Sequence, residues 1–156
     1  MHRISLSLLA LAYLGSAPLA AAQSQSTDIR PHASRMMDND LKASFAGQTH
    51  SGAYNFTPKG EPTRFYEERH HKNGSVVYSE GDGDETGIWR VLKNKICYLY
   101  ESNKMSGGCF RVYRVANCYY FYSDRLIERK DELDQDYWTA RSTIKGEAPQ
   151  CEAALS

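Results

Sequence analysis

The sequence has no excess of charge of either sign, because 19 lysine and arginine residues balance 19 aspartate and glutamate residues. Proteins that bind nucleic acid or anionic membranes normally carry a basic excess, so the balance argues against both classes. Beyond its first 22 residues the chain also lacks the run of about 20 apolar residues that a membrane crossing needs. Hydrophobic residues at 41% and charged residues at 24% are near the globular average, which excludes wholesale disorder.

Motifs of the common catalytic and metal-binding classes are missing as well. The sequence contains no Gly-x-Ser-x-Gly elbow and no C-x-x-C or H-x-x-x-H spacing. The neighbours His70 and His71, which have His50 in a preceding strand, would point to opposite faces of their own strand. The acidic stretch 80–85 has Lys93 where an EF-hand loop needs its final glutamate. We therefore expect no metal ion and no cofactor, and we favour a role without catalysis.

The first 22 residues have the pattern of a cleavable secretory signal. Arg3 gives a positive start, residues 4–15 are apolar apart from two serines, and Ala20-Ala21-Ala22 offers a small-residue cleavage site. We therefore predict a periplasmic or secreted protein with three parts: a signal peptide over 1–22, a flexible polar arm over 23–37, and a single domain over 38–156.

All four cysteines follow this leader, so they are expected in an oxidising compartment as disulfides. Four cysteines allow three pairings, and sequence alone does not decide among them. A hairpin centred on Asn103 would place Cys97 opposite Cys109, within disulfide reach, which leaves Cys118 for Cys151. A Cys109–Cys118 pair fits less well, because the turn residues between them lie away from the hairpin centre that it requires.

Short extended runs separated by turn residues determine the expected fold. Asn73-Gly74 between two such runs is a strong hairpin signal. A short helix is expected over 38–45, with Leu41 and Phe45 on one face and Asp38 as a possible cap. Some apolar positions in the charged stretch 124–136 are compatible with a further helix. The expected strands are 48–56, 62–70, 75–81, 86–92, 95–101, 108–115, 118–123 and 137–144.

No helix lies between the central strands, which excludes parallel architectures. We predict an all-β fold, an antiparallel meander curled into a small barrel or half-barrel, with the N-terminal helix closing one end.

Tyrosine is unusually frequent, with 11 residues against 5 phenylalanines. Residues 119–122 are four aromatics in a row, so both faces of that strand carry rings. Tyrosine combines an apolar ring with a polar tip, which suits sugars, peptides and protein partners, although strands favour aromatics for structural reasons too. The candidate ligand-binding residues are Trp89, Tyr98, Tyr100, Tyr120, Tyr122 and Arg111.

Several short motifs resemble those of a group of small exported proteobacterial proteins classed as a domain of unknown function. The likeness covers residues 41–122 and rests on Gly47-x-Thr49-x-x-Gly52, Phe65-Tyr66-Glu67, Asn73-Gly74, Gly87-Ile88-Trp89-x-Val91, Ile96-Cys97-Tyr98-x-Tyr100 and Cys109-x-x-Val112. It implies a β-rich domain in the cell envelope and implies no activity.

Two functional classes follow from these observations. The first is an exported, non-catalytic protein that binds an envelope ligand or protein through an aromatic-rich β surface, including an inhibitor of a host hydrolase such as lysozyme. The second is a small hydrolase whose site assembles only in three dimensions. The sequence determines neither the partner nor the oligomeric state.

Overall fold

The computed structural model describes residues 33–55, 63–81, 83–102, 107–124 and 138–151. The predicted signal peptide over 1–22, residues 23–32 of the predicted arm and residues 125–136 of the possible further helix lie outside the described residues. The elements are β1 (Ser34–Arg35), α1 (Asp38–Phe45), β2 (Thr49–Tyr54), β3 (Phe65–His70), β4 (Ser75–Glu80), β5 (Gly83–Val91), β6 (Ile96–Tyr100), β7 (Gly108–Val115), β8 (Cys118–Ser123) and β9 (Ala140–Ile144).

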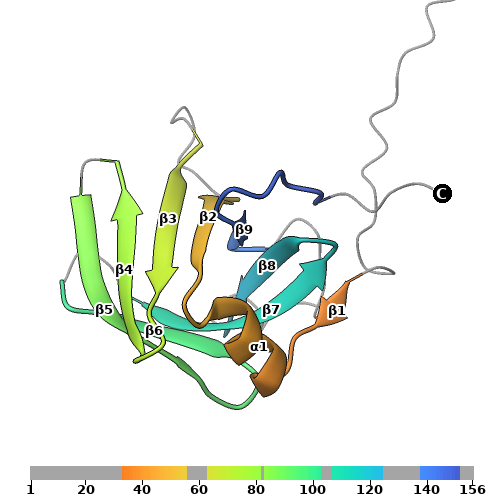
Figure 1. Cartoon of the computed structure of the whole chain (residues 1–156), viewed down its shortest axis with the longest axis horizontal. Coiled ribbons are helices and arrows are strands. Elements are labelled where there is room, and N and C mark those ends of the chain that lie inside the picture. The colour runs from red at the N-terminus through yellow and green to blue at the C-terminus, as the bar shows by residue number, and fades with distance from the viewer. Residues whose placement is uncertain (1–32, 56–62, 82, 103–106, 125–137, 152–156) are drawn as a thin grey trace, which may run out of the picture.

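The strands form a closed antiparallel barrel, which confirms the predicted all-β class and meander (Figure 1). Each strand from β2 to β9 pairs with the next along the chain, and β9 closes the barrel by pairing with both β8 and β2. Closure leaves no sheet edge among these eight strands. An eight-stranded barrel encloses a space that side chains fill or that holds one small ligand.

Tight turns set the strand register. In the β3–β4 connection Gly74 has a φ of +91°, and the side-chain oxygen of Asn73 accepts a hydrogen bond from the backbone N–H of Ser75 at 3.0 Å. Lys93 and Asn94 both have positive φ in the β5–β6 turn, as a type I′ hairpin requires. Strand β5 begins at Gly83, three residues earlier than expected, because its first residues pair with the end of β4.

Helix α1 occupies the predicted range and closes one end of the barrel. Leu41 and Phe45 are fully buried and belong to the main core. The cap position is taken by Met37, not by Asp38, the first residue of the helix. The Asp38 carboxylate instead accepts a hydrogen bond from the backbone N–H of Asn94 in the β5–β6 turn, which attaches the helix to the barrel.

The end of the predicted arm is part of the fold. Ser34 and Arg35 pair with β7, and the backbone N–H of Met36 donates to the carbonyl of Val112 at 2.9 Å. Met36 is buried in the main core. Burial of the Met36 side chain explains why residues 34–36 lie against the barrel, since it brings β1 alongside β7.

Both predicted disulfides are present. Cys97 and Cys109 are partners in the β6–β7 register and form one bridge. Cys118 and Cys151 form the other, which holds the C-terminal segment on the outer face of β8. The part of the chain that the structure describes contains no helix with the length and apolar character that a membrane crossing requires.

Candidate ligand-binding site

The barrel interior differs between its two ends. At the α1 end it is filled by apolar side chains, and Phe45 stacks on the His50 ring with 4.3 Å between ring centroids. Towards the opposite end, where β2 finishes and β3 begins, the interior contains a cavity of about 330 Å³. This volume is within the range of small-molecule sites. The described residues lining it are Tyr54, Arg64, Tyr66, Glu68, Tyr78, Tyr98, Tyr100, Gly107, Phe110, Phe121, Ser123, Thr139 and Ala140.

Strand alternation explains how the wall of this cavity is built. In β3, Tyr66, Glu68 and His70 are buried, while their neighbours are less buried and lie on the opposite face. The same period of two directs the tyrosines of β4 and β6 inward. Five tyrosines from four strands therefore converge on one space.

The tyrosine hydroxyls are engaged with each other and with two carboxylates. Tyr54 and Tyr78 are 2.9 Å apart between hydroxyl oxygens, and Tyr78 donates to Glu80 near the rim. Tyr100 donates to Glu68 deeper inside. Because these polar tips have partners, the rings present mainly their faces and edges to the cavity.

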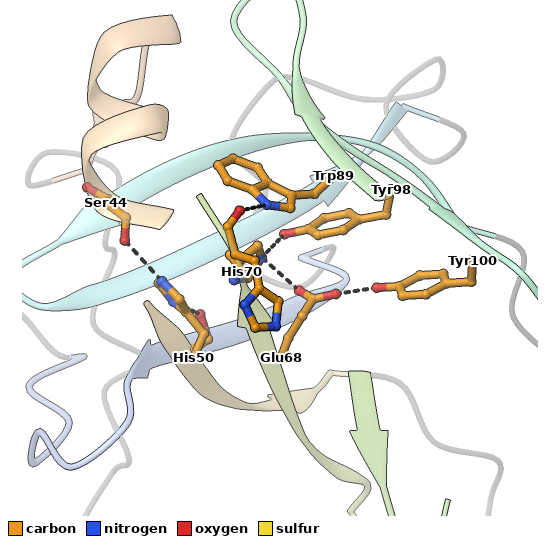
Figure 2. Close-up of polar contacts among 9 residues, drawn as sticks. Ser44, His50, Glu68, His70, Trp89, Tyr98 and Tyr100 are labelled. Atoms are coloured by element: carbon orange, nitrogen blue, oxygen red, sulfur yellow. Dashed lines mark hydrogen bonds and ion pairs between the residues drawn. The ribbon is translucent and has the colours of Figure 1, made fainter. Parts of the chain in front are cut away.

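Glu68 lines the cavity and contacts His70, which is not among the lining residues (Figure 2). Nε2 of His70 is 3.3 Å from a carboxylate oxygen of Glu68 and 2.9 Å from the hydroxyl of Tyr98. Burial raises the pKa of Tyr98 and Tyr100, and the charge of Glu68 raises it further. Both tyrosines are therefore neutral over the physiological range and act as hydrogen-bonding rings.

His50 belongs to the packed end and ties the helix to the sheet (Figure 2). Its Nε2 lies 3.2 Å from the carbonyl of Ser44 in α1, and its Nδ1 lies 3.2 Å from the hydroxyl of Ser142 in β9. Burial, followed by the proximity of His70, lowers the pKa of His50 to about 3. The neutral ring satisfies both contacts, with Nε2–H donating to the carbonyl.

An ion pair stands at the rim. The guanidinium of Arg64 donates to Glu80, with 2.6 Å between Nη2 and Oε2, and this bond holds the pKa of the Glu80 carboxyl below its usual range. The Arg64 guanidinium also lies over the ring of Tyr54, 5.3 Å from its centroid, so the ion pair stays in contact with the wall of the cavity.

The six candidate residues named from the sequence do not share one surface. Tyr98 and Tyr100 line the cavity, and Trp89 packs inside the barrel near the α1 end, where its indole N–H donates to the carbonyl of His71. Arg111, Tyr120 and Tyr122 lie on the outer face of β7 and β8.

The outer tyrosines are covered rather than exposed. Tyr120 is 3% accessible and donates to the carbonyl of Cys151 at 2.8 Å. Trp138 packs against its ring with 6.0 Å between centroids. The Cys118–Cys151 disulfide thus holds the C-terminal segment over the outer face of β8, where the sequence analysis had placed part of its candidate binding surface. Arg111 is 3.8 Å from the carboxylate of Asp124.

Sequence reasoning considered His70 only as a metal ligand, and it did not select Glu68 or the inward tyrosines of β2, β3 and β4. The period of two in a strand places Tyr66, Glu68 and His70 on one face of β3, but it does not tell which face points into the barrel.

The described residues give little support to metal binding by the histidines or by the acidic stretch 80–85. No group of three or more His, Cys, Asp or Glu side chains is arranged to hold a metal ion there. His70 is buried while His71 sits in the turn, as expected for neighbours at the end of a strand. Asp82, in the acidic stretch, lies outside the described residues.

In comparisons with protein-family models, with curated proteins and with solved structures, no match to this chain was found.

Proposed function

We propose that this protein is an exported, non-catalytic binding module whose barrel cavity takes a small ligand. The observation that carries the proposal is the tyrosine-lined cavity of about 330 Å³ at the end opposite α1. Its composition is that of ligand sites in general, mostly aromatic surface with a few placed polar groups. The aromatic binding face expected from the sequence is thus assigned to the interior of the barrel.

Binding is favoured over hydrolysis by the charged groups in the wall. Glycosidase chemistry with a carboxylate pair needs two such groups about 5–9.5 Å apart on either side of the bond. The described lining contains Glu68 as its one carboxylate, and Glu68 is held by Tyr100 and His70. A passive site for a small molecule uses this arrangement without further groups.

The proposed location is the periplasm or the medium. The leader pattern of residues 1–22 and the two disulfides support it, because disulfides persist in oxidising compartments. We also propose kinship with the small exported proteobacterial proteins whose motifs the chain resembles. N-terminal sequencing of exported material tests the location: a chain that begins at Gln23 supports it, and one that begins at Met1 contradicts it.

Ligand-observed NMR with a set of neutral, cationic, anionic and sugar fragments tests the binding itself. Fragments that bind the cavity should lose about tenfold or more in affinity in Tyr100→Ala, since a buried aromatic contact of this kind contributes roughly 1–2 kcal/mol. Leu99→Ala is the matched control, because Leu99 is the adjacent residue on β6 and is 66% exposed on the outer face. Absence of any bound fragment, or equal losses in both variants, would refute the proposal.

A further inference from the structure

Glu68 is the one carboxylate in the described lining of the cavity. Glu68 is 5% accessible, and among the described residues its ion-pair contact is with the ring of His70 and not with a lysine or arginine. Arg64, the one arginine in the lining, is bound to Glu80. A buried carboxylate is stabilised by positively charged partners, and its described ion-pair contact is with His70 alone, so Glu68 offers an anionic contact to a cationic ligand.

The aromatic walls of the cavity also favour a positively charged ligand. Ring centroids of neighbouring tyrosines lie 5.1–6.1 Å apart around the cavity, and Tyr98 and Tyr100 are parallel to within 3°. Phe110 continues the wall with its centroid 6.1 Å from that of Tyr98. The face of an aromatic ring is negative, and several faces around one space attract cations, above all quaternary ammonium groups that are easily dehydrated.

The hydroxyl groups of the wall tyrosines do not oppose the attraction of a cation. Tyr100 directs its hydrogen to Glu68, and Tyr78 directs its hydrogen to Glu80, so these donors are already used by carboxylates. The charge of Glu68 also acts on its surroundings, because it raises the pKa of Tyr66, Tyr98 and Tyr100 beyond the effect of burial. The carboxylate and the aromatic rings are therefore two separate features of the cavity that favour a positively charged ligand.

From these observations we infer that the cavity selects a small organic cation, a quaternary ammonium or a protonated amine, through the carboxylate of Glu68 and the surrounding tyrosine faces. The inference rests on the proposed function and specifies the class of its ligand. The cationic head lies against the rings and near Glu68, and the remainder of the ligand extends towards the rim at Arg64 and Glu80.

A pair of probes of equal shape tests the charge preference. Choline carries a trimethylammonium group, and 3,3-dimethylbutan-1-ol replaces its nitrogen by carbon. Titration calorimetry on the exported protein should give an affinity for choline at least about tenfold higher than for the alcohol, as expected for a desolvated cation on aromatic faces.

Two variants locate the source of the preference. Glu68→Gln keeps the size and an acceptor for Tyr100 while removing the charge, so it should lower the affinity for choline about tenfold and leave that for the alcohol unchanged. Glu67→Gln is the matched control, because Glu67 is the preceding residue on β3 and lies outside, 2.7 Å from the ammonium of Lys145. This variant should keep the full ratio between the two probes.

The possible failures are distinct. If the alcohol binds as tightly as choline, the inference is overturned while the proposed function stands. If neither probe binds although other fragments occupy the cavity, the inference is again overturned. If no fragment of any charge binds, the proposed function fails and the inference with it. The comparison of the two probes on the unaltered protein decides these cases even if Glu68→Gln does not fold.

Discussion

His50 makes the stability of the protein depend on pH between about 3 and 6.5. Its ring is neutral in the folded protein, where its pKa is about 3, while the unfolded chain has the ordinary value near 6.5. Between these two values the unfolded state binds one more proton than the folded state, so stability is complete above about pH 6.5 and falls as the pH decreases towards 3. Each pH unit in this range removes about 1.4 kcal/mol.

The expected size of the effect follows directly. At pH 4.5 the solution is about two pH units below the pKa of His50 in the unfolded chain. Between pH 7.5 and pH 4.5, the titration of His50 alone should therefore lower the free energy of unfolding by about 3 kcal/mol. That is a large part of a net stability of roughly 5–15 kcal/mol. Urea unfolding at several pH values measures it.

The variant His50→Gln separates this contribution from those of the other ionisable groups. Gln can place an N–H near the carbonyl of Ser44, which His50 now contacts, but it does not titrate. It should be less stable at pH 7.5, because the stacking on Phe45 is lost. Its stability should then fall by about 3 kcal/mol less than that of the unaltered protein between pH 7.5 and 4.5. Parallel curves for His50→Gln and the unaltered protein would refute the reasoning.

Three further predictions concern the barrel and its wall. Gly52→Ala should destabilise the protein by roughly 1–3 kcal/mol in urea unfolding, because the new Cβ would lie 2.5 Å from the carbonyl oxygen of Arg141. Gly83→Ala is the control, since its new Cβ would meet no atom within 4 Å, and it should be nearly neutral. Replacing Cys118 and Cys151 together by serine should lower the free energy of unfolding by roughly 4 kcal/mol, the loop entropy for a separation of 33 residues. Amide hydrogen exchange should then rise first in the C-terminal segment that covers β8. Equal exchange with and without the disulfide would contradict this prediction. Ultraviolet titration to pH 11 should leave a resistant group of phenolic side chains un-ionised in the folded protein, since burial raises the pKa of each; its members are Tyr54, Tyr66, Tyr78, Tyr98 and Tyr100.

Local signals in the sequence were sufficient for α1 and for strands β2 to β9, but not for β1, whose residues were expected in the flexible arm. The strands and the helix could be predicted because alternation, turn residues and helix spacing act over a few residues. Asn73-Gly74 marks a turn without knowledge of the rest of the chain, and the same hairpin logic gave the Cys97–Cys109 register. Where a strand begins depends on its partner, which is why β5 starts earlier than its own residues indicate.

Closure of the barrel could not be predicted in the same way. It depends on pairing between β2 and β9, whose partners, such as His50 and Ile144, are almost a hundred residues apart in sequence. Nothing local in either strand specifies that partner. The covered state of Tyr120 has the same origin, because it follows from the bridge to Cys151 and the segment which that bridge anchors.

The cavity was missed because β3 breaks the usual pattern of a strand with one apolar face. Tyr66, Glu68 and His70 point inward, and Glu67 and Arg69 point outward, so polarity does not distinguish the two faces. A polar inner face is tolerated only if its groups find partners, and here Tyr100 supplies one to Glu68 while Tyr98 supplies one to His70. Those partners come from β6, so the arrangement exists only once the barrel is closed.

The position of the cavity follows from where the chain uses large and small side chains. At the α1 end, Phe45 and Leu41 enter the barrel from the helix and fill it. At the other end the lining includes Gly107 and Ala140, which contribute little volume. The hydroxyls of the wall tyrosines are held by Glu68, by Glu80 and by one another. Space therefore remains between the rings, and the buried carboxylate of Glu68 makes that space attractive to a cation rather than to an apolar side chain.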